Sequence, residues 1–224
     1  MDRKDGLTML FDSSRCIGCD GCTAICKSSY NLSPNILRTN IVERKIENDP
    51  SEGKTRRIYY KNACLHCTEA SCVMACPTGA CHKNEDGLVV INEQLCISCN
   101  YCAKNCPYNA ISYDKANGKV EKCNLCAERY NEGLEPLCAA DCPEKAILFG
   151  PRSKILDYAK RRIEDLKGKG FADANLYGES NFGGQRVLAV LEERPKAYGL
   201  PENPEIPLLL RTFSGMPIRP VTLL

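Results

Sequence analysis

The chain has 224 residues with 17 cysteines, and its 30 lysines and arginines nearly balance 28 acidic residues, for a formal charge of +2. The basic side chains are scattered among acids, which excludes the basic stripe of a nucleic-acid-binding protein. No window approaches the roughly 18 apolar residues of a membrane span, and residues 1–6 lack the apolar core of a signal peptide. We therefore expect a chain that is soluble or held at a membrane by its partners, in the cytoplasm or the periplasm.

The N-terminal quarter predicts a strand, a cysteine group and a hairpin. Residues 7–12 should form a short strand that leads into the first group, and the end of that group should open a short helix. The group has the spacing C-x2-C-x2-C-x3-C, at Cys16, Cys19, Cys22 and Cys26. Residues 36–47 and 56–61 are rich in β-branched and aromatic side chains and flank a turn sequence at 49–53, which predicts a β-hairpin.

Two further cysteine groups occupy the middle of the chain. The second has the spacing C-x2-C-x4-C-x3-C-P, at Cys64, Cys67, Cys72 and Cys76. A turn at 78–80, a tight reversal at 84–87 and a short strand at 88–91 are predicted after it. The third group has the spacing C-x2-C-x2-C-x3-C-P, at Cys96, Cys99, Cys102 and Cys106. Residues 108–113 and 119–122 are predicted to be small strands.

The fourth group has the spacing C-x2-C-x11-C-x3-C-P, at Cys123, Cys126, Cys138 and Cys142. Its long gap predicts a helix at 127–133 that is closed by glycine. Beyond Pro151 the cysteines stop, and apolar residues at helical spacing predict one amphipathic surface helix: Ile155, Ala159, Ile163 and Leu166. Residues 186–192 predict a strand. From Pro195 onward the chain is irregular and proline-rich, so we expect that segment to have no core of its own and to lie on a partner subunit.

Four groups of four cysteines point to iron–sulfur chemistry. Thiolates at this density select zinc, copper(I) or iron–sulfur clusters. Zinc sites use two C-x2-C pairs separated by a longer stretch, and disulfide frameworks belong to small secreted domains. In the C-x2-C-x2-C-x3-C-P run of bacterial ferredoxins, three thiolates hold one cluster and the fourth ligates another. Four such runs predict four 4Fe–4S clusters. Spacing alone permits nested pairing (first run with fourth, second with third) and sequential pairing (first with second, third with fourth).

Several residues beside these groups are interpreted separately. Cys81, the odd cysteine, is predicted to be a small buried hydrophobe and not a ligand. His66 should form a hydrogen bond or lie at the surface, because its run already contains four cysteines. Lys122, Lys104 and Lys27 adjoin cysteines, and they either tune reduction potentials or are solvated. No G-x-G-x-x-G, P-loop, H-E-x-x-H or nucleophile–base motif is found, so we predict no catalytic residue.

The four runs, their order and the x4 and x11 gaps resemble the four-cluster iron–sulfur subunits of the molybdopterin and tungstopterin oxidoreductases. Residues 122–126, 133–136, 176–177, 183–184 and 198–204 resemble formate dehydrogenase beta subunits in particular. The resemblance implies nested pairing. One cluster would be held by Cys16, Cys19, Cys22 and Cys142, a second by Cys64, Cys67, Cys72 and Cys106, a third by Cys96, Cys99, Cys102 and Cys76, and a fourth by Cys123, Cys126, Cys138 and Cys26.

The same resemblance implies an α+β fold of two bacterial-ferredoxin-like modules, with short strands and short helices around paired 4Fe–4S clusters. Residues 1–35 and 116–150 would form the outer module and residues 63–115 the inner module. Residues 36–62 would be a β-hairpin insertion, and residues 151–224 a C-terminal helix, a strand and a proline-rich tail that binds a partner.

The implied function is electron transfer without catalysis, in a formate dehydrogenase-like complex. The chain would connect a large molybdenum- or tungsten-pterin catalytic subunit to a membrane cytochrome, a quinone-linked subunit or another redox subunit. One alternative is the iron–sulfur subunit of a polysulfide, thiosulfate, tetrathionate or dimethyl sulfoxide reductase. The other is a free polyferredoxin, a shuttle protein with no fixed enzyme partner.

Overall fold

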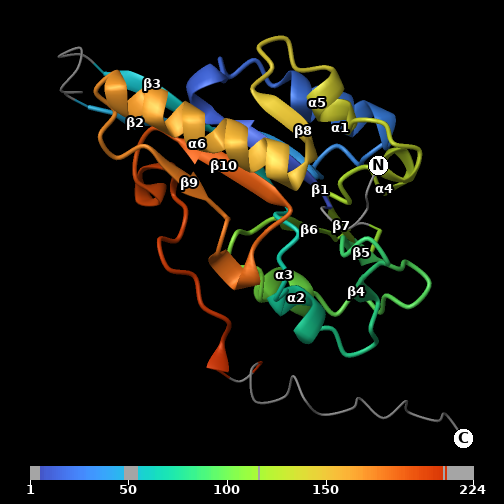
Figure 1. Cartoon of the computed structure of the whole chain (residues 1–224). Coiled ribbons are helices and arrows are strands. Elements are labelled where there is room, and N and C mark those ends of the chain that lie inside the picture. The colour runs from blue at the N-terminus through green and yellow to red at the C-terminus, as the bar shows by residue number, and fades with distance from the viewer. Residues whose placement is uncertain (1–5, 48–54, 116, 209, 211–224) are drawn as a thin grey trace, which may run out of the picture.

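A four-stranded sheet in the order β8–β1–β10–β9 organises the fold (Figure 1). The structure is a computed structural model that describes residues 6–47, 55–115, 117–208 and 210. Strand β1 (Leu7–Asp12) pairs antiparallel with β8 (Ile147–Pro151) and parallel with β10 (Val187–Leu191), which pairs antiparallel with β9 (Asn175–Tyr177). Strands from the two ends of the chain therefore lie side by side in one sheet.

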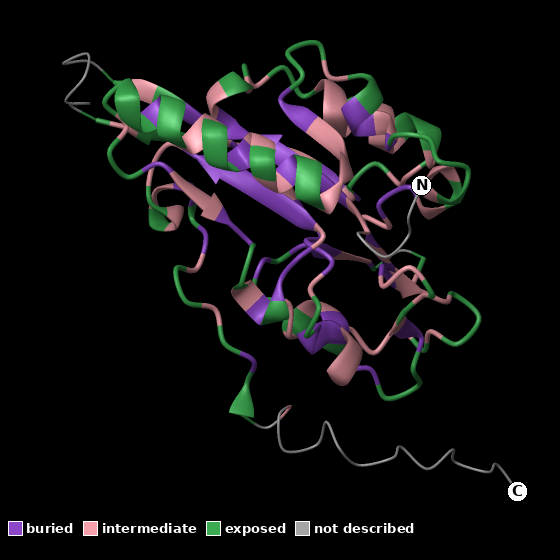
Figure 2. Ribbon diagram, viewed as in Figure 1, coloured by how far each residue is buried: buried purple, intermediate pink, exposed green. Residues whose placement is uncertain are grey.

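Both faces of this sheet are covered. All five residues of β10 are buried, and their continuous apolar sequence is typical of a strand without a solvent face. Side chains alternate along β1, so Leu10 packs toward helix α6 (Arg152–Gly168) while Met9 and Phe11 pack into the main core on the other side. The predicted amphipathic surface helix is confirmed in α6, whose outer face is exposed above the buried strands (Figure 2).

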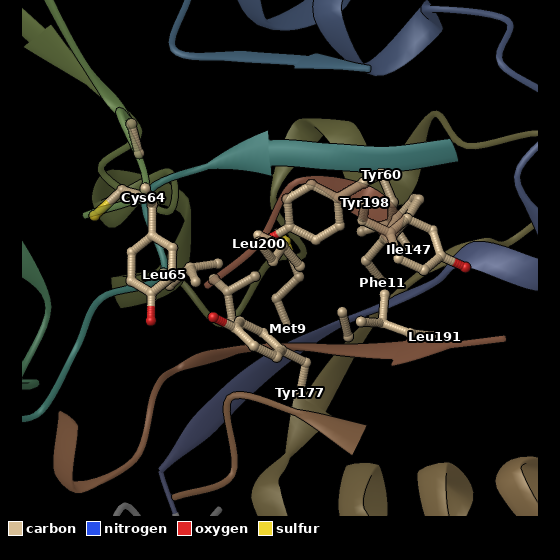
Figure 3. Packing of buried hydrophobic residues seen from close by; sticks show 14 of the residues in the cluster. Met9, Phe11, Tyr60, Cys64, Leu65, Ile147, Tyr177, Leu191, Tyr198 and Leu200 are labelled. Atoms are coloured by element: carbon tan, nitrogen blue, oxygen red, sulfur yellow. The ribbon is translucent and has the colours of Figure 1, made fainter. Parts of the chain in front are cut away.

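The predicted β-hairpin is confirmed as β2 (Thr39–Ile46) paired antiparallel with β3 (Arg56–Ala63). Its expected turn at 49–53 lies outside the described residues. Strand β3 buries Ile58 and Tyr60 in the main core. The ring of Tyr60 lies edge-on to Phe11, with 6.1 Å between centroids, and near Tyr198, at 6.3 Å (Figure 3). The hairpin is thus fixed to the face of the sheet opposite α6.

Four helices carry cysteines, and they pack in two pairs. Helix α1 (Gly21–Ser29) packs against α5 (Leu137–Ala140), and α2 (Ser71–Met74) packs against α3 (Tyr101–Lys104). The two pairs occupy different ends of the molecule, as Figure 1 shows. The first and fourth cysteine groups therefore lie together, as do the second and third.

The remaining elements are short. Two short hairpins are formed by β4 (Cys81–Lys83) with β5 (Val89–Ile91) and by β6 (Ile111–Asp114) with β7 (Lys119–Lys122). Helix α4 (Ala127–Asn131) is followed by Gly133, which has a positive φ of 74° and ends it as predicted. Short 3₁₀ helices are η2 (Ser13–Arg15), η3 (Asn181–Gly183) and η4 (Pro195–Tyr198). Within the described residues, no helix is both long enough and apolar enough to cross a bilayer.

The segment after Pro195, which the sequence predicts to have no core of its own, packs in its described part against the main core of this chain, and its contact with a partner subunit stays a prediction. The Tyr198, Leu200 and Ile206 side chains are buried in the main core. The Tyr198 hydroxyl also lies 3.0 Å from Ser13 Oγ and accepts a hydrogen bond from the Glu192 amide at 3.2 Å. Single apolar side chains between prolines can be buried one at a time, without the periodicity that marks a helix or strand. The rest of the expected tail, residues 211–224, lies outside the described residues.

Candidate metal centres

The first group and the end of the fourth meet at one cavity. It is lined by Cys16, Cys19, Cys22 and Cys142. Phe11 from the sheet and Ile41 from the hairpin also line it. Gly18, with a φ of +71°, makes the tight turn between the first two cysteines, and a Cβ there would overlap the ring of Tyr59.

A second cavity lies beside the first because helix α1 contributes Cys22 to the first and Cys26 to the second. It is lined by Cys26, Cys123, Cys126 and Cys138. The chain between the fourth-group cysteines turns its amides inward, since the Leu125 amide donates to Cys123 Sγ at 3.4 Å. Both Leu125 and Cys126 have a positive φ, of 57° and 50°, to make this turn. The ammonium-bearing side chain of Lys61 also lines the cavity.

A third cavity lies at the other end of the molecule. It is lined by Cys76, Cys96, Cys99 and Cys102, with Ala80 and Val120 among its apolar walls. The Cys81 amide donates to Cys76 Sγ at 3.3 Å. Ser98 and Asn100 adopt positive φ values of 57° and 64°, which curl the third group around the cavity. The donor set is again three cysteines of one group and the last cysteine of another.

The remaining four cysteines of the repeat are also brought together. The Cys67 thiol interacts electrostatically with those of Cys64, Cys72 and Cys106. Burial raises the pKa of Cys64 and of Cys67 to about 12. Gln185 Nε2 lies 3.5 Å from Cys67 Sγ and donates to the Tyr108 hydroxyl at 2.8 Å. These four cysteines therefore lie near one another, and the assignment of the four sets as ligands stays a prediction.

These donor sets fit a cluster better than a single ion. Burial raises the pKa of Cys16, Cys102 and Cys138 to about 11, so thiolates there require a nearby positive charge such as a metal supplies. Zinc would hold four sulfurs at about 2.3 Å, hence within about 3.8 Å of one another. Among the described residues no three such side chains close around one ion. Three thiols of one group joined by the last thiol of another suit a larger thiolate-bound group, a 4Fe–4S cluster.

Comparison with known proteins agrees with this chemistry. Two family models, both described as a 4Fe-4S dicluster domain, match residues 15–80 and 55–152. The formate dehydrogenase iron-sulfur subunit of Haemophilus influenzae is 34% identical over 245 residues, covering 98% of this chain and 76% of that protein. The chain belongs to the family of 4Fe–4S dicluster iron–sulfur subunits. Both ferredoxin-like domains of this iron–sulfur subunit are consistent with several 4Fe–4S clusters.

Two other relatives of this iron–sulfur subunit come from Escherichia coli. The iron-sulfur subunit of the nitrate-inducible formate dehydrogenase is 31% identical over 231 residues, covering 96% of this chain and 79% of the relative. The B subunit of anaerobic dimethyl sulfoxide reductase is 38% identical over 160 residues, covering 69% of this chain and 76% of the relative.

The residues that adjoin the cysteine groups in the sequence have different surroundings in the structure of this iron–sulfur subunit. His66 is fully buried, and its Nδ1 accepts a hydrogen bond from the Val89 amide at 3.1 Å. Burial, reinforced by nearby lysines, holds the pKa of His66 well below its usual value, so the ring is neutral. Lys122 is buried and donates to the carbonyls of Val89 and Cys123, whereas Lys104 is exposed.

The other two residues from that set also have defined environments. Lys27 is half-buried and donates to the Pro34 carbonyl. Cys81 is buried, as expected of a small hydrophobe, and its exclusion from the ligands stays a prediction.

Sequence analysis missed Lys61 and Gln185. Lys61 is 3% exposed, and burial alone would lower its pKa, but the thiolates of Cys138 and Cys123 more than offset this and raise it. The available signal was a lysine inside an aromatic strand three residues before a cysteine pair. Gln185 follows two glycines in a segment without periodicity and carries no comparable signal.

Proposed function

We propose that this chain is an electron-transfer subunit that carries four 4Fe–4S clusters in a line. The donor sets are those described above: Cys16, Cys19, Cys22 and Cys142; Cys26, Cys123, Cys126 and Cys138; Cys64, Cys67, Cys72 and Cys106; and Cys76, Cys96, Cys99 and Cys102. The observation that carries this proposal is the grouping of thiols into sets of three plus one. Clusters of this type are one-electron carriers, and the chain itself would contribute binding, spacing and electrostatics.

A linear order is supported by residues that neighbouring sites share. Cys22 and Cys26 lie on one helix, α1, and line the first two cavities, so these sites are adjacent. The other two sites are adjacent for the same reason, because Cys72 on α2 belongs to one set and Cys76, just after α2, lines the cavity of the other. Cys64 interacts electrostatically with Cys123, which joins the two pairs at their junction. Electrons would therefore cross the molecule from one terminal cavity to the other.

Exposed apolar residues lie at both ends of this line. Ile17, 58% exposed, follows the first cysteine of the terminal set at one end, and Cys19 beside it is also exposed. Ile97, 63% exposed, occupies the matching place at the other end, with Tyr101 close in sequence and half exposed. Apolar residues next to a redox site suit contact with another protein, so we assign these two ends as the electron entry and exit.

The partner we propose is a large molybdenum- or tungsten-pterin subunit that oxidises formate. The support is that the two formate dehydrogenase subunits match 96% and 98% of this chain, including the C-terminal part, whereas the B subunit of dimethyl sulfoxide reductase matches 69%. The reaction would occur on that partner, and this chain would pass electrons to a cytochrome, quinone-linked or other redox subunit. A dimethyl sulfoxide reductase-type complex is the second candidate, favoured by the 38% identity over the cluster-binding region.

Anaerobic purification of the tagged chain from its own host tests the proposal. We expect about sixteen irons per chain, co-purification of a large pterin-containing subunit, and bleaching of the cluster absorbance when formate is added. Bleaching by a reduced quinol analogue followed by reoxidation with dimethyl sulfoxide, but no response to formate, would instead establish the second candidate. Iron far below sixteen, or zinc in its place, would refute the four-cluster assignment.

A further inference from the structure

Lys61 is buried beside the second cavity without a compensating partner. It lies on β3 and is 3% exposed, and its Nζ is a buried nitrogen with no hydrogen-bond partner among the described residues. It takes part in none of the ion pairs found in the described part of the chain. Lys122 is a useful contrast, because this second buried lysine donates to two backbone carbonyls.

A buried ammonium without a partner is strongly destabilising, so it requires a negative charge nearby. The groups that interact with Lys61 are cysteines: Cys138, Cys123, Cys22 and Cys26. Three of them line the cavity that Lys61 also lines, and Cys22 belongs to the neighbouring site. The thiolates of a cluster, which carries about −2 when oxidised, are the charge that this lysine would balance.

We propose that the Lys61 ammonium is a built-in counter-charge for the cluster held by Cys26, Cys123, Cys126 and Cys138, and that it raises the reduction potential of that cluster. This inference rests on the proposed function. When the site accepts one electron from its neighbour in the line, its net charge falls by one unit and no proton is taken up. A fixed cation in a low-dielectric environment favours the more negative form, so the reduced state is stabilised more than the oxidised state.

The test compares charge at position 61 with charge elsewhere on the same hairpin. The variants are Lys61→Met and Lys61→Gln, which remove the charge, Lys61→Arg, which keeps it, and Lys45→Met, which removes an exposed charge from β2. Each is purified anaerobically as the complete complex, its iron is measured, and its clusters are titrated by EPR against applied potential. We expect the neutral variants to lower the midpoint potential of one cluster by about 59 mV. This shift corresponds to about a tenfold change in the equilibrium constant of its one-electron reduction.

Lys61→Arg and Lys45→Met should leave that midpoint close to the wild-type value, and the cluster of Cys76, Cys96, Cys99 and Cys102 should not shift in any variant. Fully loaded neutral variants with wild-type midpoints would overturn the proposal. If the neutral variants lose iron while Lys61→Arg retains it, the charge itself is needed to hold the cluster, which supports the proposal. Loss of iron in Lys61→Arg as well would make the residue a packing requirement and overturn it.

Failure of the proposed function gives a different result. Wild-type protein with far fewer than about sixteen irons would remove the four-cluster assignment before any variant is compared. If the wild-type protein carries full iron but the substitutions at position 61 do not shift any midpoint, only the proposed role of Lys61 is lost.

Discussion

Two double substitutions can decide how the cysteine groups pair. Cys19 and Cys142 line the same cavity, so we expect Cys19→Ser with Cys142→Ser to remove two thiolates from one cluster. Three intact clusters and about twelve of sixteen irons should remain. In sequential pairing these cysteines would belong to different clusters, and only two clusters would stay intact.

The reciprocal variant provides the matched control. Cys76 lines the cavity at the far end, so Cys19→Ser with Cys76→Ser should damage two clusters and leave two intact. Sequential pairing gives the opposite result, because Cys19 and Cys76 would then share a cluster. Anaerobically prepared protein is analysed for iron, and intact 4Fe–4S clusters are counted by Mössbauer spectroscopy. Three intact clusters in the Cys19–Cys76 variant and two in the Cys19–Cys142 variant would refute the nested arrangement.

Three further predictions concern single side chains. Gln185→Leu removes the amide donor 3.5 Å from Cys67 Sγ, so the midpoint of that cluster should fall in an EPR titration while the other three stay unchanged. Leu188→Ala, between the sheet and α6, should cost about 2–5 kcal/mol of unfolding free energy. Leu134 is exposed, so Leu134→Ala should lower the unfolding free energy by about 0.5 kcal/mol or less. Equal melting temperatures for the Leu188→Ala and Leu134→Ala variants would contradict this difference. Burial raises the folded-state pKa of Glu192 above its ordinary value of 4.5. The free energy of unfolding should therefore fall as pH rises from 4.5 through the folded-state pKa, by less than about 1.4 kcal/mol per pH unit. Glu192→Gln should flatten this pH dependence when melting temperatures are measured across the same range.

Local patterns were enough for many of the elements but not for their arrangement. The strands predicted at 7–12 and 119–122 match β1 and β7, because a short strand can be recognised within one segment of the sequence. The position of β10 beside β1 was not predicted, since pairing between opposite ends of the chain depends on packing. Strands β4 and β9 have three residues each, which is too short for a period to be seen.

The cysteine groups were visible at once, whereas their partners required the fold. Spacing gives three ligands of each predicted set, but the fourth depends on which helices pack together, and the α1–α5 and α2–α3 contacts favour nested pairing. Lys61 was overlooked because lysines are seldom fully buried. Its burial follows from the way the hairpin lies against the cysteine-lined cavity. The division of the chain into outer module, inner module, insertion and tail stays a prediction.

The parallel contact between β1 and β10 also has a consequence for biosynthesis. All sixteen cysteines of the repeat have been translated once residue 142 is made, yet the strand that covers one edge of β1 begins only at Val187. A nascent chain shorter than this exposes an unpaired strand edge, which promotes aggregation. A truncated polypeptide that keeps every cysteine but stops after β8 would therefore make a poor minimal ferredoxin.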